Sequence, residues 1–134
     1  MYLTISAFLL ATLFVSASAF AAPAARIRGE DADGKKISIV LDAKGSPRVQ
    51  GSPRSNPTIK DFREDGAVAN YCFEGSEREV RKILTALVQA ANGDGDSWAD
   101  LRKITRNARG LVVSADIIDE GGKREENYLI THCK

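Results

Sequence analysis

The sequence has few of the residues on which metal-binding and redox proteins depend. Its 134 residues include two cysteines and one histidine, and the cysteines, Cys72 and Cys133, lie far apart. That spacing excludes a CxxC redox motif and a zinc-thiolate site. The single imidazole, on His132, excludes any metal site that requires two histidines. We therefore predict neither a metal site nor a cofactor.

An excess of charge of one sign is also missing. The 19 lysines and arginines oppose 18 aspartates and glutamates, which leaves a formal net charge of +1. This balance is not that of a strongly basic nucleic-acid binder, so no specific nucleic acid is expected as a partner. The sequence contains no Walker loop and no G-x-S-x-G motif, and we identify no catalytic residues. No stretch carries a family motif that would assign roles to residues.

Charged side chains are absent from residues 1–25. Residues 5–15 are almost wholly apolar, and residues 16–25 are rich in alanine and serine. This order is typical of a secretory signal peptide. We interpret residues 1–21 as a signal of bacterial type, cleaved after Ala21, and predict a periplasmic or secreted protein with no membrane span after cleavage. An uncleaved membrane anchor is the alternative.

Export makes a disulfide the expected state of the two cysteines. An even number of cysteines in an oxidising compartment indicates pairing, and only one intramolecular pair, Cys72 with Cys133, is available. A loop of this length gives about 4 kcal/mol of stabilisation in the chain-entropy model. A reactive thiol pair is the alternative interpretation. The disulfide would bring the strand before the predicted helix close to the last strand.

Residues 22–134 are expected to form a single small α+β domain. Alternating or apolar runs predict strands over residues 26–30, 36–41, 68–73, 100–107, 110–118 and 124–133. The S-x-x-E capping box of Ser76 and Glu79 predicts a helix start. One apolar stripe follows at helical spacing, formed by Val80, Ile83, Leu84, Leu87, Val88 and Ala91. We expect one helix packed on a mainly antiparallel sheet of about five to six strands, in the order β-β-loop-β-α-β-β-β, with a single disulfide.

Residues 43–66 are expected to form a long loop rich in proline, glycine and serine. They contain three of the four prolines, and the tetrapeptide at residues 45–48 recurs at residues 51–54. We predict that this loop binds a protein or an anionic envelope polymer through its basic residues, which are Arg48, Arg54, Lys60 and Arg63. A merely solvated, flexible loop and a protease-inhibiting loop are the alternatives.

A second basic run could extend this surface. It comprises Arg102, Lys103, Arg106 and Arg109, whereas residues 116–126 are predominantly acidic. The chain is therefore neutral overall but could carry a basic face. Trp98, the sole tryptophan, is expected to be a core or sheet-cap anchor.

Two further segments contain residue types that occur in calcium sites and in ribonuclease active sites. The Asn92, Asp94 and Asp96 run resembles calcium loops but fails the EF-hand template, because Ser97 stands where glycine is needed. A small ribonuclease would combine a carboxylate, a histidine and an arginine, and the candidate residues are Arg124, Glu125, Glu126 and His132. On one extended strand, Glu126 and His132 would lie about 20 Å apart, too far for one site.

The expected function is therefore that of an exported, small, non-catalytic binding or accessory module of the envelope or the medium. An inhibitor of a secreted or host hydrolase is the first alternative, and a small secreted hydrolase such as a ribonuclease is the second. Fold-level analogy cannot decide among them.

Overall fold

The computed structural model describes residues 23–52, 56–63, 66–93 and 98–134. The predicted signal peptide, residues 1–21, lies outside the described residues. So do Arg54, Asp94 and Asp96.

The described residues form one mixed sheet of seven strands, in the order β3-β2-β1-β4-β7-β6-β5. The strands are β1 (Ala25–Glu30), β2 (Lys36–Leu41), β3 (Pro47–Val49), β4 (Ala69–Gly75), β5 (Trp98–Asn107), β6 (Gly110–Asp119) and β7 (Gly122–His132). All neighbouring strands pair antiparallel except β4 and β7, which are parallel. The chain therefore builds two antiparallel groups, β1–β4 and β5–β7, joined by one parallel pair.

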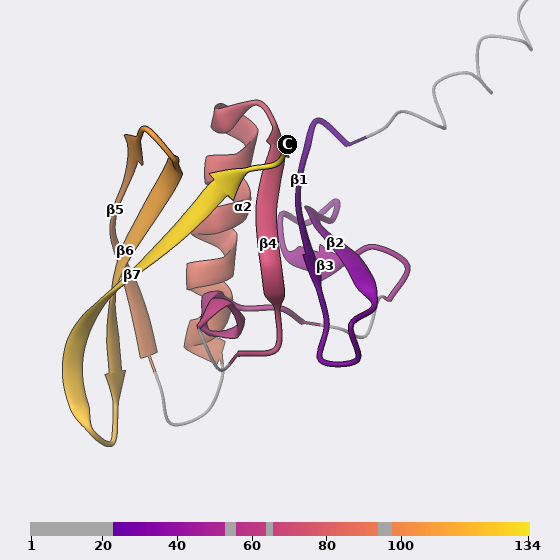
Figure 1. Cartoon of the computed structure of the whole chain (residues 1–134). Helices are drawn as coiled ribbons and strands as arrows, with labels where there is room; N and C mark the ends of the chain where they lie inside the picture. Colours follow the sequence, from indigo (N-terminus) through magenta and orange to yellow (C-terminus); the bar gives the residue numbers. More distant parts are fainter. Residues whose placement is uncertain (1–22, 53–55, 64–65, 94–97) are drawn as a thin grey trace, which may run out of the picture.

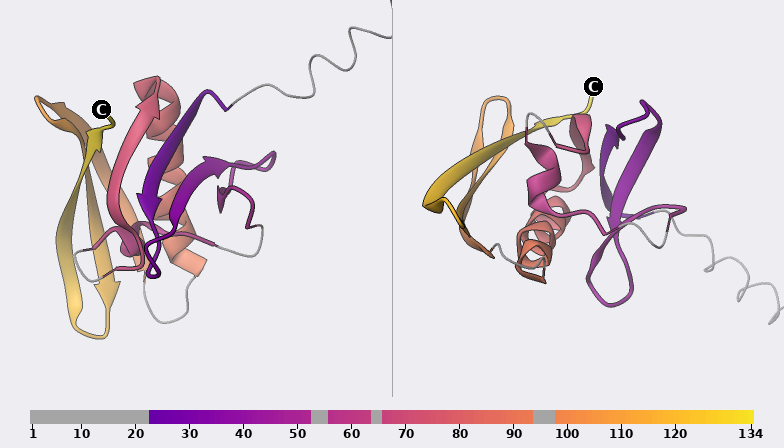
Figure 2. Two further views of the ribbon diagram at one scale, coloured as in Figure 1. Left: turned by 45° about the vertical axis from the view of Figure 1, so that its right-hand side comes forward. Right: turned by 90° about the horizontal axis from the view of Figure 1, so that it is seen from below.

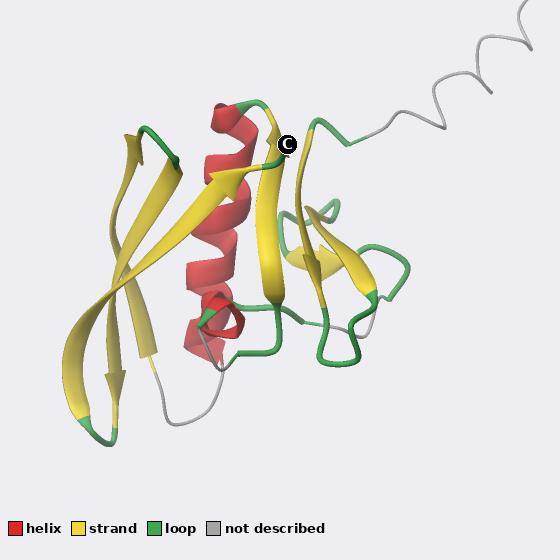
Figure 3. Cartoon of the chain, viewed as in Figure 1, coloured by secondary structure: helices red, strands yellow, loops and turns green. Residues whose placement is uncertain are grey.

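The sheet curls into a half-barrel around the helix α2 (Glu77–Ala90) (Figures 1 and 3). Seen from below, the helix lies between the group β5–β7 and the group β1–β3 (Figure 2). It contacts both edges of the curl, β3 and β5. Two short 3-10 helices, η3 (Ile59–Phe62) and η4 (Ala91–Gly93), complete the fold.

This architecture contradicts the predicted fold class. We expected a mainly antiparallel sheet of about five to six strands with one helix on its face. The protein is instead mostly sheet, with seven strands in one mixed, curled sheet and a single α-helix among the described residues. The sheet curls around the helix, so the core is enclosed on several sides and is not a flat layer.

The segment predicted as a loop, residues 43–66, contributes a strand and a 3-10 helix. β3 pairs with β2, and η3 begins with a capping box in which Asp61 accepts from the Thr58 amide at 2.8 Å. Five side chains of this segment are buried, namely Pro47, Val49, Pro57, Ile59 and Phe62. The structured part of this segment is therefore core material as well as surface.

The predicted helix is confirmed. Ser76 is its N-cap, and the serine hydroxyl accepts from the Glu79 amide at 3.2 Å. All six residues of the apolar stripe are buried against the concave face of the sheet. The helix has 14 residues and is amphipathic, and no helix in the described ranges has the length and hydropathy needed to cross a membrane.

The predicted disulfide between Cys72 and Cys133 is present, with a Cα–Cα distance of 4.9 Å. It lies at the parallel junction, where β4 and β7 pair through Cys72 with Thr131 and Phe73 with His132. The amide of Cys133 also donates to the Phe73 carbonyl at 2.8 Å. The expected proximity of these two strands is thus confirmed, although their parallel direction was not predicted.

Trp98 is not the core anchor that was expected. It begins β5 with 51% of its surface exposed, and its indole N–H donates to Asp100 at 3.1 Å. The side chain opposite it in the ladder is Ile118 on the outer face of β6. Strand alternation places Ala99, the next residue, on the buried face instead.

Candidate functional site

A groove of about 610 Å³ lies on the outer, convex face of β1, β2 and β4. This volume is within the range of roughly 300–1,000 Å³ typical of small-molecule sites. Its walls combine polar and apolar groups and contain no aromatic residue. They are formed by Arg28, Gly29, Glu30, Lys36, Ile37, Ser38, Gln50, Gly51, Asn70, Cys72, Cys133 and Lys134.

Strand register explains why these side chains meet. Ile27 points into the core, so its neighbours Arg28 and Arg26 point outward. Arg28 is opposite Ser38 on β2 and opposite Cys72 on β4. Lys36 lies two pairs further along, opposite Glu30. Diagonal neighbours on one face are about 7–8 Å apart, so the long side chains of Arg28 and Lys36 can reach one ligand.

A β-bulge shapes one wall of the groove. The register between β1 and β4 shifts between Arg28 and Glu30, and Asn70 adopts a left-handed backbone with φ of 51°. Gly29 permits this close approach, because a Cβ there would lie 2.7 Å from Cγ1 of Val68. Asn70 then donates from its side chain to Oε2 of Glu30. Bulges of this kind re-aim side chains and are common beside binding sites.

Positive charge is in excess around the groove. Glu74 forms ion pairs with Nε of Arg26 and with Nη1 of Arg28, each at 3.3 Å, so one carboxylate faces two guanidinium groups. Lys36 forms no ion pair with any described residue. Glu30, the acid opposite Lys36, instead accepts from Asn70. The groove thus presents partly unneutralised cations together with amide and hydroxyl groups.

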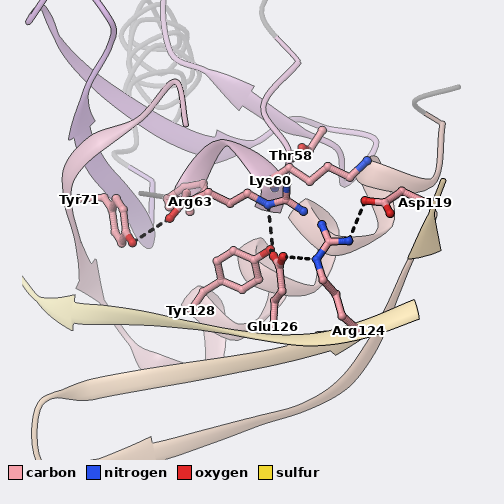
Figure 4. Close-up of polar contacts among 9 residues, drawn as sticks. Thr58, Lys60, Arg63, Tyr71, Asp119, Arg124, Glu126 and Tyr128 are labelled. Atoms are coloured by element: carbon pink, nitrogen blue, oxygen red, sulfur yellow. Dashed lines mark hydrogen bonds and ion pairs between the residues drawn. The ribbon is translucent and has the colours of Figure 1, made fainter. Parts of the chain in front are cut away.

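A second polar cluster lies where β4 and β7 diverge, and η3 fills the space between them (Figure 4). Glu126 on β7 is its centre. Oε2 accepts from Nε of Arg63 at 3.2 Å and from the Tyr128 hydroxyl at 2.6 Å, while Oε1 accepts from Nε of Arg124 at 2.8 Å. Arg124 also pairs with Asp119 at 2.8 Å. On the other side of η3, the Tyr71 hydroxyl donates to the Phe62 carbonyl at 2.9 Å.

The electrostatics of this cluster favour a structural role. Burial acts to raise the pKa of Glu126, but hydrogen bonds from Tyr128 and Arg124 and the nearby guanidinium charges outweigh it, so the pKa is lower than usual. Burial and the hydrogen bond to Glu126 raise the pKa of Tyr128 to about 12. Neither shift moves a group toward neutral pH, where a general acid or base works best. The cluster therefore holds η3 against β7.

The structure disperses the basic residues predicted in the loop. Arg48 pairs with Asp42 at 3.2 Å and donates to Asn56, while Arg63 belongs to the polar cluster. Lys60 lies on η3 near the same cluster (Figure 4). Arg54 lies outside the described residues. Arg48 and Arg63 are thus engaged within the protein.

In the second predicted basic patch, Arg102 and Arg106 form ion pairs within the protein. Arg102 pairs with Asp116 and Glu125 on the outer face, each at 3.3 Å. Arg106 instead pairs with Glu77 of the helix at 2.8 Å, on the other side of β5. Lys103 and Arg109 are exposed. The ion pairs within β5–β7 thus neutralise part of this charge.

The residues considered for a ribonuclease are separated. Glu126 and Arg124 face the polar cluster, whereas Glu125 faces outward. His132 lies at the far end of β7, with its ring 4.8 Å from the Phe73 ring and Nδ1 3.0 Å from the Cys133 carbonyl oxygen. No group of three or more metal-binding side chains occurs among residues 23–52, 56–63, 66–93 and 98–134.

Sequence reasoning missed the groove residues Arg28, Lys36 and Asn70. The alternation of Arg26, Ile27 and Arg28 was a usable signal, because it places two arginines on one face of a strand. The positions that meet them on β2 and β4 depend on the register, which the sequence does not reveal.

Comparisons with known proteins add no assignment. No protein-family model matches the chain, and neither curated proteins nor solved structures give a significant match. Function must therefore be argued from the site itself.

Proposed function

We propose that the protein is an exported, non-catalytic binding module and that the groove of β1, β2 and β4 is its ligand site. One observation carries this proposal: Arg28 and Lys36 converge on a groove that is bordered by the hydrogen-bonding side chains of Ser38, Gln50 and Asn70. Lys36 forms no ion pair with a described residue, whereas Arg48, Arg63, Arg102 and Arg106 form ion pairs within the protein.

Two features support export. Residues 1–21 have the order of a secretory signal, and the cysteines are paired. Disulfides persist in oxidising compartments such as the periplasm and the medium. Expression of the full chain in a bacterial host tests this part. We expect the protein outside the cytoplasm, with the mass of a chain that begins at Ala22. Cytoplasmic protein of full mass would contradict export.

A steric block tests the assignment of the groove. Ser38→Trp places a large ring in the groove, and Thr105→Trp places the same ring on the exposed part of β5 as a matched control. The oxidised protein is immobilised and exposed to envelope and medium fractions. We expect one component to be retained by the wild type and by Thr105→Trp. The same component should not be retained by Ser38→Trp. A component retained equally by all three proteins would place binding elsewhere.

A further inference from the structure

We infer that the ligand of this groove is a small, hydroxylated molecule that carries a phosphate or a carboxylate, such as a sugar phosphate or a sugar acid. This inference rests on the proposed function and adds the chemical class of the ligand. It follows from the charge, the hydrogen-bonding groups and the side chains that line the groove.

The first argument concerns charge. Three cationic side chains, Arg28, Lys36 and Lys134, line the groove against one acidic side chain, Glu30. Glu74, which is not part of the lining, pairs with Arg28 from β4. Glu74 pairs with both Arg26 and Arg28, and Arg28 contacts it through Nη1 alone. The remaining guanidinium N–H groups of Arg28 form no hydrogen bond with a described residue. A planar guanidinium with free donors matches the two oxygens of a phosphate or carboxylate.

The second argument concerns geometry. Lys36 lies on the same face as Arg28, two ladder pairs away, and supplies a second point charge. Asn70 donates to Glu30, so the bulge holds this acid by a hydrogen bond across the β1–β4 pair. The hydrogen bond from this neutral amide fixes Glu30 but leaves its charge in place, so an incoming anion would meet two cations, Arg28 and Lys36, beside one carboxylate. This arrangement favours a compact anionic group over a cation or a neutral apolar molecule.

The third argument concerns the rest of the ligand. Ser38, Gln50 and Asn70 offer hydroxyl and amide groups, and the lining contains no aromatic ring on which a flat ring could stack. Such walls suit a molecule that carries several hydroxyl groups. The volume of about 610 Å³ accommodates a small molecule of this kind.

The test is an NMR titration of the purified, oxidised protein with glucose 6-phosphate, glucuronate and glucose at constant ionic strength. We expect glucose 6-phosphate, glucuronate or both to shift the amide signals of Lys36, Ser38 and Asn70, and glucose to leave them unchanged. A response to one acid alone identifies the anionic group. Absence of any shift with both acids, or equal shifts with glucose, would overturn the inference.

Charge-removing variants give the second readout. Arg28→Gln should weaken binding of the acidic sugar by roughly tenfold or more, and Arg28→Lys should weaken it less, because the charge remains. Lys103→Gln on β5 removes one exposed charge far from the groove and should leave binding unchanged. An equal loss in Lys103→Gln would show attraction by net charge alone and would contradict a specific site.

The two proposals can fail separately. If no acidic sugar binds but a retained component is still lost in Ser38→Trp, the ligand class is wrong and the groove assignment stands. If the acidic sugars bind through Arg28 but no component depends on the groove, the anion site stands and the proposed function is wrong.

Discussion

Nε of Arg63 lies 3.2 Å from Oε2 of Glu126, across 63 positions of the sequence. This pair connects the end of η3 to the last strand, while Tyr71 holds η3 to β4 from the other side. The strands β4 and β7 meet at the disulfide and diverge towards η3, which fills the wedge between them (Figure 1). Two cross-connections, one covalent and one electrostatic, therefore join the two halves of the sheet.

Loss of the Glu126 carboxylate should destabilise the protein. Glu126→Gln removes the charge that Arg63 and Arg124 share, and we expect the free energy of unfolding in urea to fall by about 1–3 kcal/mol. Glu125→Gln is the matched control, because Glu125 is exposed on the opposite face and pairs with Arg102 at the surface. Its effect should stay below about 0.5 kcal/mol. Equal effects of the two substitutions would contradict a stabilising role of the Glu126 ion pairs.

Acid should weaken the same connection. The pKa of Glu126 in the folded protein is below its ordinary value of 4.5, so its stabilising contribution is complete above that pH and is lost as the pH falls through the folded pKa. We expect wild-type stability to fall more steeply below pH 4.5 than that of Glu126→Gln. A residual fall should remain in the variant, because a hydrogen bond from Arg124 lowers the pKa of Asp119 and one from the Ser46 amide lowers that of Asp42. Parallel curves for the two proteins would refute this prediction.

The buried hydroxyl of Tyr128 should ionise only at unusually high pH. Tyr128 has a pKa of about 12 against an ordinary value of 10.0, so its stabilising contribution is complete below pH 10.0 and is lost as the pH rises towards 12. In an ultraviolet titration we expect phenolate absorbance to appear late, since burial also raises the pKa of Tyr71. Tyr128→Phe should remove the latest step. Complete ionisation of the wild-type tyrosines near pH 10.0 would mean that the Tyr128 hydroxyl is exposed to solvent and would contradict this prediction.

The bulge residue offers a matched pair of substitutions. Asn70→Gly and Asn70→Ala both delete the side chain that donates to Glu30, but only glycine adopts the φ of 51° without strain. We expect Asn70→Ala to be less stable than Asn70→Gly by about 1–2 kcal/mol in chemical denaturation. Equal stabilities would mean that the bulge relaxes when the side chain is shortened.

The sequence predicted the elements whose signals are local. The Ser76 cap and the apolar stripe defined α2, and alternation located most of the strands. β3 was missed because it is only three residues long and begins at a proline, which an edge strand tolerates. The curl and the parallel β4–β7 pair were missed because they depend on packing between distant segments.

The candidate site was less predictable than the fold. Arg124 and Glu126 belong to an alternating strand whose buried face includes Tyr128 and Ile130, and alternation alone gives no reason to place charges beside that core. Glu126 is half-buried and Arg124 is exposed, and the position of Glu126 becomes intelligible once η3 brings Arg63 to it. The groove depends in the same way on register and on the bulge at Asn70, neither of which has a sequence signature.

The topology has a consequence for the order of folding. β1–β3 lie within residues 25–49 and β5–β7 within residues 98–132, so each of these antiparallel groups forms from neighbouring segments of chain. The disulfide joins positions 61 apart in the sequence, and the parallel pair β4–β7 lies beside it. Because closing a long loop is slower than pairing adjacent strands, we expect the two groups to form first and the junction to close last. The half-barrel is therefore completed only once Cys133 is free to meet Cys72.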